Sequence, residues 1–521
     1  MVRVTFILAT LLAITTAAPT TSQSAAAALS SLGLSLPNDE PLIGNPGYTC
    51  EILNYALSKN TTFTVNSPYY DPLIDEVWSQ NCRLSASCVV TPEPAEEVSL
   101  VLKVLGILET KFAIRSGGHN TNPGFSSVGS DGVLTALEKL NALSISADHR
   151  TLTVGPGNRW QAVYEYLEPY HVTVLGGREI VVGVGGFLLG GGLSIFYNTH
   201  GLAIDSVTRF QVVLPDGRIV DATQSENADL YKGLKGGLNN FGIVVEYDLT
   251  TNTATDIYYE IKTYTIADTP SVLSAYATYL LDADVNSNIQ IQINSNYTLV
   301  FYSYLGHVSS TPTAFDPFLD IPVASTLVPP TNGSLSNVLF TLGAERQTSP
   351  GISYSGTFTF AVTSPDFLQS TYTAYLEAAA SMPAGADLFY APQGIIPNLV
   401  AKAESQNGGN LLGLEATPQV WANIFVEFQS HQSVKQSAEF GSLPLVTGIV
   451  DSLLADLASS AGPQEILLPY IFVNDAGPAQ EPLQSFGEEN LSFIDAVAKK
   501  YDPDGVMQKL QNEAYFVSKA L

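Results

Sequence analysis

Three clusters of glycine constrain this chain more than any other feature of its sequence. They are Gly117-Gly118, the stretch Gly183–Gly192 and the stretch Gly236–Gly242, each beside an apolar run. Glycine tolerates positive φ and lets a ligand reach backbone N–H groups that a Cβ would cover. One such cluster is typical of a tight corner between a strand and a helix, whereas three in one region favour a cradle for a phosphate-bearing cofactor.

The spacing of these glycines argues against the common nucleotide-binding loops. Read from Gly183, the pattern G-x-G-x-x-G places Leu188 where its third glycine belongs, and no acidic residue follows at the distance of a ribose contact. The chain also has no Gly-Lys-Ser/Thr of a P-loop and no Gly-x-Ser-x-Gly elbow of a hydrolase. A Rossmann domain, a P-loop domain and an α/β-hydrolase are therefore disfavoured.

Charge narrows the classes of partner. The chain has 49 acidic and 22 basic residues, a formal net charge of −27 at pH 7. That charge repels the phosphates of nucleic acids and of anionic membranes, so we expect neither as a partner. The 521 residues are 45% hydrophobic, which is ample for a core, and the length predicts more than one domain. The histidines have no metal-like spacing, and we expect no metal site.

The first residues predict secretion. A short basic start precedes an apolar run at Val4–Ile14 and small residues at Thr15–Ala18. This is the pattern of a secretory signal peptide, and the run is too short to span a membrane. We therefore expect a signal peptide over residues 1–18, cleavage between residues 17 and 24, and an extracellular mature chain that starts with a loosely ordered segment at Thr20–Leu36.

Secretion bears on the cysteines and the glycosylation sequons. Cys50, Cys82 and Cys88 allow one disulfide and leave one thiol over, and a bond from Cys50 to either of the other two is the natural pairing. A secreted chain also carries N-linked glycans on surface sequons. The candidate acceptors are Asn60, Asn296, Asn332 and Asn490.

The order of the expected elements indicates two interleaved domains. Short strands at 87–92 and 112–114, with a helix over 95–108 between them, predict a β-α-β start. Beyond about residue 255, alternating Tyr- and Ile-rich runs predict a large antiparallel sheet. The helices expected over one of its faces span 270–282, 368–380 and 446–460. The expected fold class is α+β, with a mixed α/β domain from both chain ends and a middle domain of antiparallel sheet covered by helices.

Together these residues resemble the berberine-bridge-enzyme-like FAD-linked oxidases, within the superfamily that shares the para-cresol-methylhydroxylase (PCMH) and vanillyl-alcohol-oxidase (VAO) type of FAD-binding domain. The matching segments, in family order, are Cys88–Pro92, Arg115–His119, Gly183–Gly186 with Gly190–Gly192, Asn240–Val244 and Tyr501–Pro503. The resemblance implies a two-domain PCMH/VAO-type fold. Its expected parts are a FAD-binding domain over 45–254 with a core at about 84–254, a substrate-binding domain over 255–450, and a C-terminal segment over 451–521 that returns to the FAD-binding domain.

The resemblance also implies how FAD is held. In the family, the histidine at the position of His119 is bonded covalently to the 8α-methyl of the flavin. Many members add a second link through a cysteine, but that position is Glu179 here, so a single link is expected. The resemblance further implies a disulfide between Cys50 and Cys88, with Cys82 free. The other implied cofactor contacts are Arg115, Ser116, Gly117, Gly118, Asn120, Gly183, Val184, Gly185, Gly186, Asn240, Gly242, Ile243, Val244 and Asn474.

The catalytic base is left open by the resemblance. Many relatives have a tyrosine base two residues before the position of Asn474, and that residue is Phe472 here. Tyr470 would point to the same side if this segment is a strand, which makes it one candidate base. Glu404 is the other candidate, because burial would raise its pKa into the range of a base. The residues expected to line the substrate pocket are Tyr197, His200 and Phe472.

The sequence thus predicts a secreted, monomeric FAD-dependent oxidoreductase. It would oxidise a small organic substrate, such as a secondary metabolite, an alcohol or an amine, by hydride transfer to flavin N5, and O2 would reoxidise the flavin with release of H2O2. The first alternative is a carbohydrate or oligosaccharide oxidase, which Phe472 disfavours because a sugar hydroxyl needs a base. The others are a flavin-carrying binding protein without a base and a dehydrogenase that uses another electron acceptor.

Overall fold

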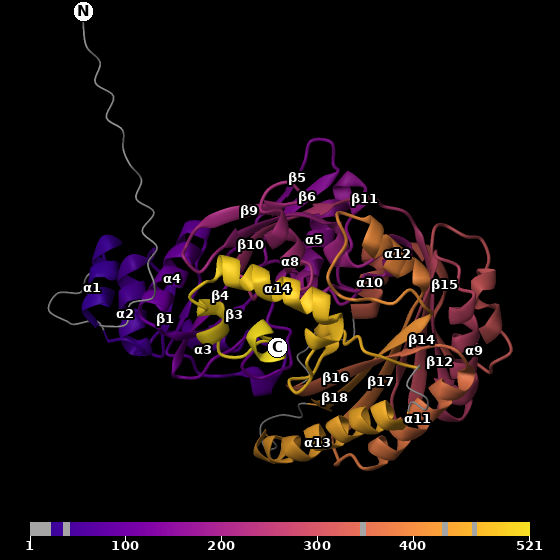
Figure 1. Cartoon of the computed structure of the whole chain (residues 1–521). Helices are drawn as coiled ribbons and strands as arrows, with labels where there is room; N and C mark the ends of the chain where they lie inside the picture. Colours follow the sequence, from indigo (N-terminus) through magenta and orange to yellow (C-terminus); the bar gives the residue numbers. More distant parts are fainter. Residues whose placement is uncertain (1–21, 35–41, 344–350, 430–435, 461–465) are drawn as a thin grey trace, which may run out of the picture.

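The computed structural model describes residues 22–34, 42–343, 351–429, 436–460 and 466–521. The signal peptide expected over residues 1–18 lies outside them. Figure 1 shows two halves: the indigo and magenta part of the chain forms the first half together with the yellow C-terminal end, and the orange middle forms most of the second. Within the described residues, no helix is long and apolar enough to cross a membrane.

The first sheet contains the predicted β-α-β start. Its elements are β1 (Thr62–Thr64), β2 (Cys88–Val90), α4 (Ala95–Ile107), β3 (Lys111–Arg115) and β4 (Gly132–Ala136). The strands lie in the order β1-β2-β4-β3, and β2, β4 and β3 are parallel. Helix α4 connects β2 to β3 and carries Glu96 and Glu97 in its first turn, where carboxylates suit the positive end of the helix dipole. The expected β-α-β start is confirmed.

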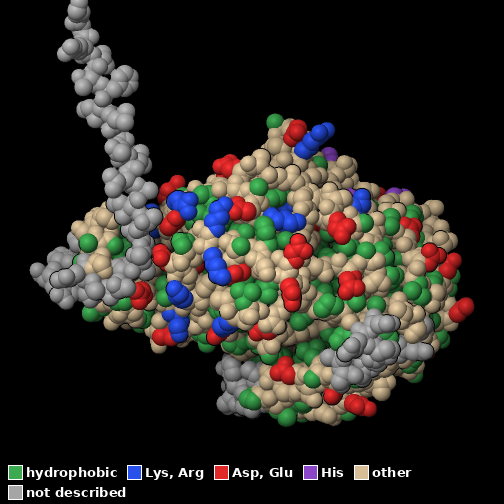
Figure 2. Space-filling view, in the orientation of Figure 1, with side chains coloured by type: hydrophobic (Ala, Val, Ile, Leu, Met, Phe, Trp, Pro, Cys, Tyr) green, Lys and Arg blue, Asp and Glu red, His purple; other side chains and the backbone are tan. Residues whose placement is uncertain are grey.

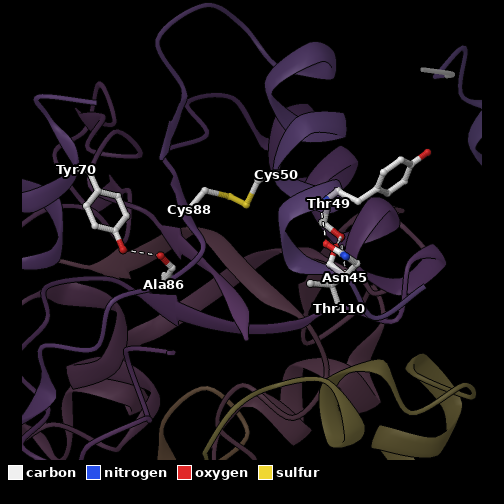
Figure 3. The surroundings of a disulfide bond; sticks show 8 residues. Asn45, Thr49, Cys50, Tyr70, Ala86, Cys88 and Thr110 are labelled. Atoms are coloured by element: carbon white, nitrogen blue, oxygen red, sulfur yellow. Dashed lines mark hydrogen bonds between the residues drawn. A yellow bond between two sulfur atoms is a disulfide. The ribbon is translucent and has the colours of Figure 1, made fainter. Parts of the chain in front are cut away.

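A disulfide joins this sheet to helix α2 (Pro46–Ala56). Cys50 in α2 is bonded to Cys88 at the start of β2 (Figure 3), which confirms the expected pairing, and Cys82 is a buried free thiol. One prediction for the preceding segment is wrong, since α1 (Ser22–Ser31) is a helix and not a loosely ordered stretch. An alanine-rich run has high helix propensity, and Leu29 packs into the apolar cluster around α2 and α4.

A second sheet completes the first half. It has the order β5-β6-β10-β8-β9, and all its neighbouring strands are antiparallel. The strands are β5 (Leu143–Ile145), β6 (Thr151–Val154), β8 (Val207–Val213), β9 (Ile219–Thr223) and β10 (Ile243–Thr250). The remaining short elements of the two halves are α3 (Tyr70–Ile74), α5 (Trp160–Leu167), β7 (Val172–Thr173), α6 (Val184–Leu189), α7 (Tyr197–His200), α8 (Ala228–Leu234), β11 (Asn252–Thr253), α10 (Leu335–Gly343) and α12 (Pro397–Ser405).

The second half is the predicted large antiparallel sheet, with eight strands in the order β15-β12-β14-β13-β17-β18-β16-β19. They are β12 (Ile257–Thr265), β13 (Ser287–Ile293), β14 (Tyr297–Leu305), β15 (Ser325–Gly333), β16 (Gly351–Ala361), β17 (Ala386–Ile395), β18 (Gln419–Gln429) and β19 (Leu467–Leu468). Helices α9 (Thr269–Leu281), α11 (Pro365–Ala380) and α13 (Gln436–Ser460) cover one face (Figure 1), where they share an apolar core with the strands. The domain boundary expected at residues 450/451 falls within α13.

The C-terminal segment returns to the first half. It contains α14 (Glu488–Tyr501), α15 (Val506–Lys509) and α16 (Val517–Ala520). The N–H of Phe112 in β3 donates to the carbonyl of Leu510 at 2.8 Å, and the N–H of Asn512 donates back to Phe112 at 2.7 Å. The other face of the large sheet packs on this half in a second core, to which Tyr259 and Trp421 belong. The prediction of an α/β half drawn from both chain ends is therefore confirmed.

Candidate functional site

The backbones of the first two glycine clusters are in contact at Gly117 and Gly183. Gly117 follows β3, and Gly183 lies at the N-terminus of α6. A Cβ placed on Gly183 would lie 2.5 Å from the Cα atom of Gly117, closer than a real Cβ atom approaches a backbone. The Ser116 hydroxyl joins the two loops, because it donates to the carbonyl of Pro156 at 2.5 Å and accepts the N–H of Gly185 at 3.3 Å. The glycines are required here because two backbones touch.

Beside this contact the backbone is open. Gly186 is exposed, and a Cβ there would meet no atom within 4 Å. The Asn474 side chain borders the opening: its Nδ2 donates to the carbonyl of Gly186 at 3.2 Å, and its Oδ1 accepts the N–H of Gly192 at 3.1 Å. A Cβ on Gly190 would overlap the Asn474 amide. We call the loops Ser116–His119 and Gly183–Gly192, together with Asn474, the cradle.

His119 lies at the end of the first cradle loop, half-buried, with its ring stacked on the indole of Trp78 at a centroid distance of 4.5 Å. The backbone N–H of Trp78 donates to the carbonyl of Gly118 at 2.8 Å. Gly118 has φ +67°, and a Cβ there would overlap the carbonyl oxygen of Glu76. The segment around Trp78 thus supports the loop from behind and orients the imidazole. Sequence reasoning missed Trp78, because no motif links it to the loop.

Arg115 is buried beneath the same loop. Its Nη1 donates to the carbonyl of Leu73 at 2.6 Å, whereas its buried Nη2 has no hydrogen-bond partner among the described residues. Burial lowers the pKa of the guanidinium, and the carboxylates of Glu138 and Glu76 oppose that shift. Arg115 therefore places a buried positive charge with an unused donor under the cradle.

The third glycine cluster serves mainly to hold the C-terminal segment. The Asn240 side chain donates to the carbonyls of Gly237 at 2.8 Å and Tyr515 at 3.0 Å, and its Oδ1 accepts from Val517 N–H at 3.1 Å and Gln508 Nε2 at 2.8 Å. These bonds use both its donors and both lone pairs of its oxygen. The Asn240 amide is therefore saturated by protein groups, and the expected contact of Asn240 with the cofactor stays a prediction.

The other predicted cofactor residues lie along the loops and β10. A Cβ on Gly242 would overlap the carbonyl of Val213, so this glycine allows β10 to approach β8. Ile243 and Val244 are buried in β10, and Val184 is buried in the first turn of α6. Asn120 is exposed and accepts the N–H of Asn122 at 2.8 Å, which closes a local turn.

An aromatic cluster lies next to the cradle. The rings of Tyr470 and Phe472 contact Trp421 of β18, at centroid distances of 4.7 and 4.9 Å. Phe472 also reaches the cradle, since its Cε2 lies 3.7 Å from the position of a Cβ on Gly191. The buried Tyr470 hydroxyl has no hydrogen-bond partner among the described residues. Burial raises its pKa well above the ordinary value, and the nearby carboxylates of Asp475 and Asp205 add to that shift.

Three polar side chains meet beyond this cluster. Arg178, from the segment before α6, donates through Nη2 to Oε1 of Gln393 on β17. The Gln393 amide in turn donates to Oδ2 of Asp475 at 2.7 Å. Burial raises the pKa of Asp475 to about 6, against the opposing effects of Arg178 and the bond from Gln393. We call Arg178, Gln393 and Asp475 the polar trio.

Comparisons with known proteins identify a FAD-binding domain in this chain. A family model of a FAD-binding domain matches residues 86–223. The FAD-dependent monooxygenase macF of Penicillium terrestre is 68% identical over 529 residues, which cover 100% of this chain and 100% of macF. The FAD-dependent monooxygenase yanF of Aspergillus niger is 63% identical over 505 residues, covering 97% of this chain and 83% of yanF.

Solved structures add the fold. BBE-like 1 of Physcomitrella patens matches with a TM-score of 0.73 at 18% identity, covering 87% of this chain and 96% of that one. Glucooligosaccharide oxidase from Acremonium strictum matches with a TM-score of 0.72 at 19% identity, covering 87% and 96%. The chain belongs to the family of FAD-dependent oxidoreductases that includes macF and yanF. Its fold is the PCMH/VAO-type fold of the berberine-bridge-enzyme-like FAD oxidases.

The cradle of this family member fits FAD on the observations above. The exposed backbone at Gly186 leaves room for a flat ring system that a side chain would fill. The buried Nη2 of Arg115 has a donor to spare near the loops where a pyrophosphate would be held. Two predicted pocket residues, Tyr197 and His200, lie on α7, and both side chains contact other protein groups. The Tyr197 hydroxyl donates to the carbonyl of Gly394 at 2.7 Å, and the His200 ring packs on Phe196.

Of the two candidate bases, Glu404 lies exposed on α12, and its role as a base stays a prediction. Tyr470 does lie near the cradle, but burial holds its proton tightly. Sequence reasoning missed the polar trio, because the three residues come from segments with no shared motif. The only local signal was an acidic residue, Asp475, directly after Asn474.

Proposed function

We propose that this FAD-dependent oxidoreductase holds its FAD on His119 and oxidises a small organic substrate, such as a secondary metabolite, an alcohol or an amine, with O2 as electron acceptor. The observation that supports this best is the His119 ring, oriented by Trp78 at the end of a loop whose other end touches Gly183. Bound FAD supplies the acceptor for the hydride that leaves the substrate. The chain's own share is to hold the cofactor, shape a pocket and take up a proton.

A single covalent link follows from the cysteines. The name of the Acremonium strictum structure describes a 6-S-cysteinyl, 8α-N1-histidyl FAD in that glucooligosaccharide oxidase. This chain has a histidine in the cradle, but its last cysteine is Cys88, which is in the disulfide, and Glu179 stands before the second loop. We therefore propose attachment through His119 alone.

A metabolite-sized substrate is favoured over a carbohydrate. The full-length relatives at 63–68% identity are named monooxygenases, whereas the oligosaccharide oxidase matches at 19% identity, which speaks for the fold alone. Next to the cradle, Trp421, Tyr470 and Phe472 form a buried aromatic cluster, an apolar surrounding that suits a flat or hydrophobic molecule.

The test is anaerobic mixing of the holoprotein with small alcohols and amines and, separately, with oligosaccharides. We expect bleaching of the flavin absorbance by a small compound and not by the oligosaccharides, followed by one H2O2 per turnover when air is admitted. Reduction by oligosaccharides alone, or by no compound, contradicts the proposal. The names of the relatives favour a second candidate, a monooxygenase, which predicts 18O from 18O2 in the product in place of stoichiometric H2O2.

Secretion and glycosylation are part of the proposal. Asn60 and Asn296 are exposed, so their amides are accessible to glycan transfer. The amide nitrogens of Asn332 and Asn490 instead donate to the carbonyls of Val308 and Phe486, both at 2.9 Å. We expect mass spectrometry of the secreted chain to find glycans on Asn60 and Asn296, and an unmodified cell-retained protein would contradict this.

A further inference from the structure

The polar trio brings one carboxylate to the border between the two halves. Asp475 directly follows Asn474, whose amide borders the opening at Gly186. On its other side, Asp475 is bonded to Gln393 in the large sheet. As a residue Asp475 is partly exposed, whereas Phe472 and Ala476 close to it in the sequence are buried. The carboxylate therefore lies between the place for the cofactor and the sheet of the second half.

The directions of the two hydrogen bonds in the polar trio determine which group donates to the Asp475 carboxylate. Because Arg178 donates to Oε1 of Gln393, the amide of Gln393 must turn its Nε2 toward Asp475. Asp475 thus receives a neutral N–H and not the guanidinium itself. The other charged or titratable groups around it are Tyr470 and, beyond that ring, Asp205, which is itself close to Lys235. A carboxylate with a neutral partner in a half-buried site keeps the basicity that a direct ion pair would remove.

We propose that Asp475 is the catalytic proton acceptor of this enzyme and that Gln393 and Arg178 are its positioning residues. Gln393 holds Oδ2, and Oδ1 is the oxygen we assign to the substrate. In the step, the O–H bond of a substrate hydroxyl breaks, its electron pair stays on the substrate oxygen, and the proton forms a new O–H bond on Asp475. The proton then leaves to solvent. The inference rests on the proposed function, since it presumes a substrate that loses a proton.

The alternatives in the pocket are weaker. Tyr470 is buried with a pKa raised well above its ordinary value, so its phenolate form is scarce near neutral pH. Asp205 is fully buried, and both its oxygens are bonded, to the Asn410 amide at 2.9 Å and to the Leu202 N–H at 3.0 Å. Asp475 keeps one oxygen outside the bond from Gln393, and with a pKa of about 6 it is ionised at neutral pH.

The first test uses the holoprotein without any substrate. A carboxylate that ionises close to the cofactor perturbs the visible absorbance of the bound flavin. We expect wild type to show a pH-dependent change with a midpoint near 6, which Asp475→Asn abolishes. Glu481→Gln, an exposed carboxylate in the same C-terminal segment, should keep it. Gln393→Leu removes a bond that favours the charged form, so it should move the midpoint upward. An unchanged transition in Asp475→Asn, or an unchanged midpoint in Gln393→Leu, overturns the proposal.

The second test uses a compound that bleaches the wild-type flavin under anaerobic conditions. Asp475→Asn should slow the reduction by about 10²–10⁴-fold, the usual contribution of a general base, and should lose the decline in rate below pH 6. If wild type and Asp475→Asn are reduced equally fast, the role of Asp475 fails while the proposed function stands. If no compound reduces wild type, the proposed function itself fails, and this inference fails with it.

Discussion

The two sides of the site are built in different ways. On the cofactor side, the critical contact joins two backbones, Gly117 against Gly183. On the proposed substrate side, it joins three side chains from distant segments, Arg178, Gln393 and Asp475. A backbone contact requires glycine and so leaves a motif in the sequence. A side-chain contact between distant segments leaves none, and this is why the sequence identifies the cofactor and is silent on the catalytic group.

The two halves also differ in charge. On the face shown in Figure 2, most Lys and Arg side chains lie over the first half, and the lower right, over the large sheet, shows acidic side chains. Over residues 255–450 the basic residues are Lys262, Arg346, Lys402 and Lys435. Arg178, which belongs to the first half, therefore supplies a positive charge to a sheet that has few of its own.

The largest effect is expected from breaking the backbone contact. Gly183→Ala puts a Cβ 2.5 Å from the Gly117 backbone, where neither chain can yield, and should cost about 3 kcal/mol or more of stability together with the bound flavin. Gly186→Ala is the matched control: its Cβ meets no atom within 4 Å, and alanine suits a helix better than glycine. We expect Gly186→Ala to keep its melting temperature and to lose flavin. Equal melting temperatures for the two variants would contradict the account of the cradle.

The disulfide supports the same side of the site. Cys50→Ser opens a link over a sequence separation of 38 residues, and it should lower the free energy of unfolding by about 2–4 kcal/mol. Cys82→Ala, which removes a buried free thiol, should cost about 1 kcal/mol. Urea denaturation of the two variants measures the difference, and a larger loss for Cys82→Ala would show that the disulfide is not what stabilises this platform.

A pH-dependent effect tests the substrate side. The unfolded Asp475 carboxyl has a pKa near about 3.9, whereas in the fold it is about 6. The fold therefore binds this proton more tightly, so its contribution to stability is present below pH 4 and is lost as the pH rises through 6. Asp475→Asn should remove that loss, and the melting temperature of the variant relative to wild type should rise between pH 4 and pH 7. A constant difference over this range would mean that Asp475 has an ordinary pKa.

The smallest effect is expected at Glu404. It is exposed on α12, and Glu404→Gln should change stability by less than about 0.5 kcal/mol and leave the rate of flavin reduction unchanged. Thermal denaturation and stopped-flow reduction measure both. A loss of rate as large as that expected for Asp475→Asn would show that Glu404 takes part in the reaction.

What the sequence could predict follows the same division. The glycine loops, the element order and the Cys50–Cys88 pairing follow from local patterns and from the family resemblance. The saturation of Asn240 by the C-terminal segment does not, because that segment is linked to it only in the folded chain. The exposure of Glu404 depends on which face of α12 packs, and neighbouring residues do not decide this.

The central claim is that the cradle holds FAD on His119. The most direct test is denaturation of the purified protein in acid or detergent, followed by flavin fluorescence of the separated chain. The account predicts that the yellow colour stays with the wild-type chain and is absent from the chain of His119→Ala. Flavin that washes out of the denatured wild type, or stays bonded to His119→Ala, would contradict it.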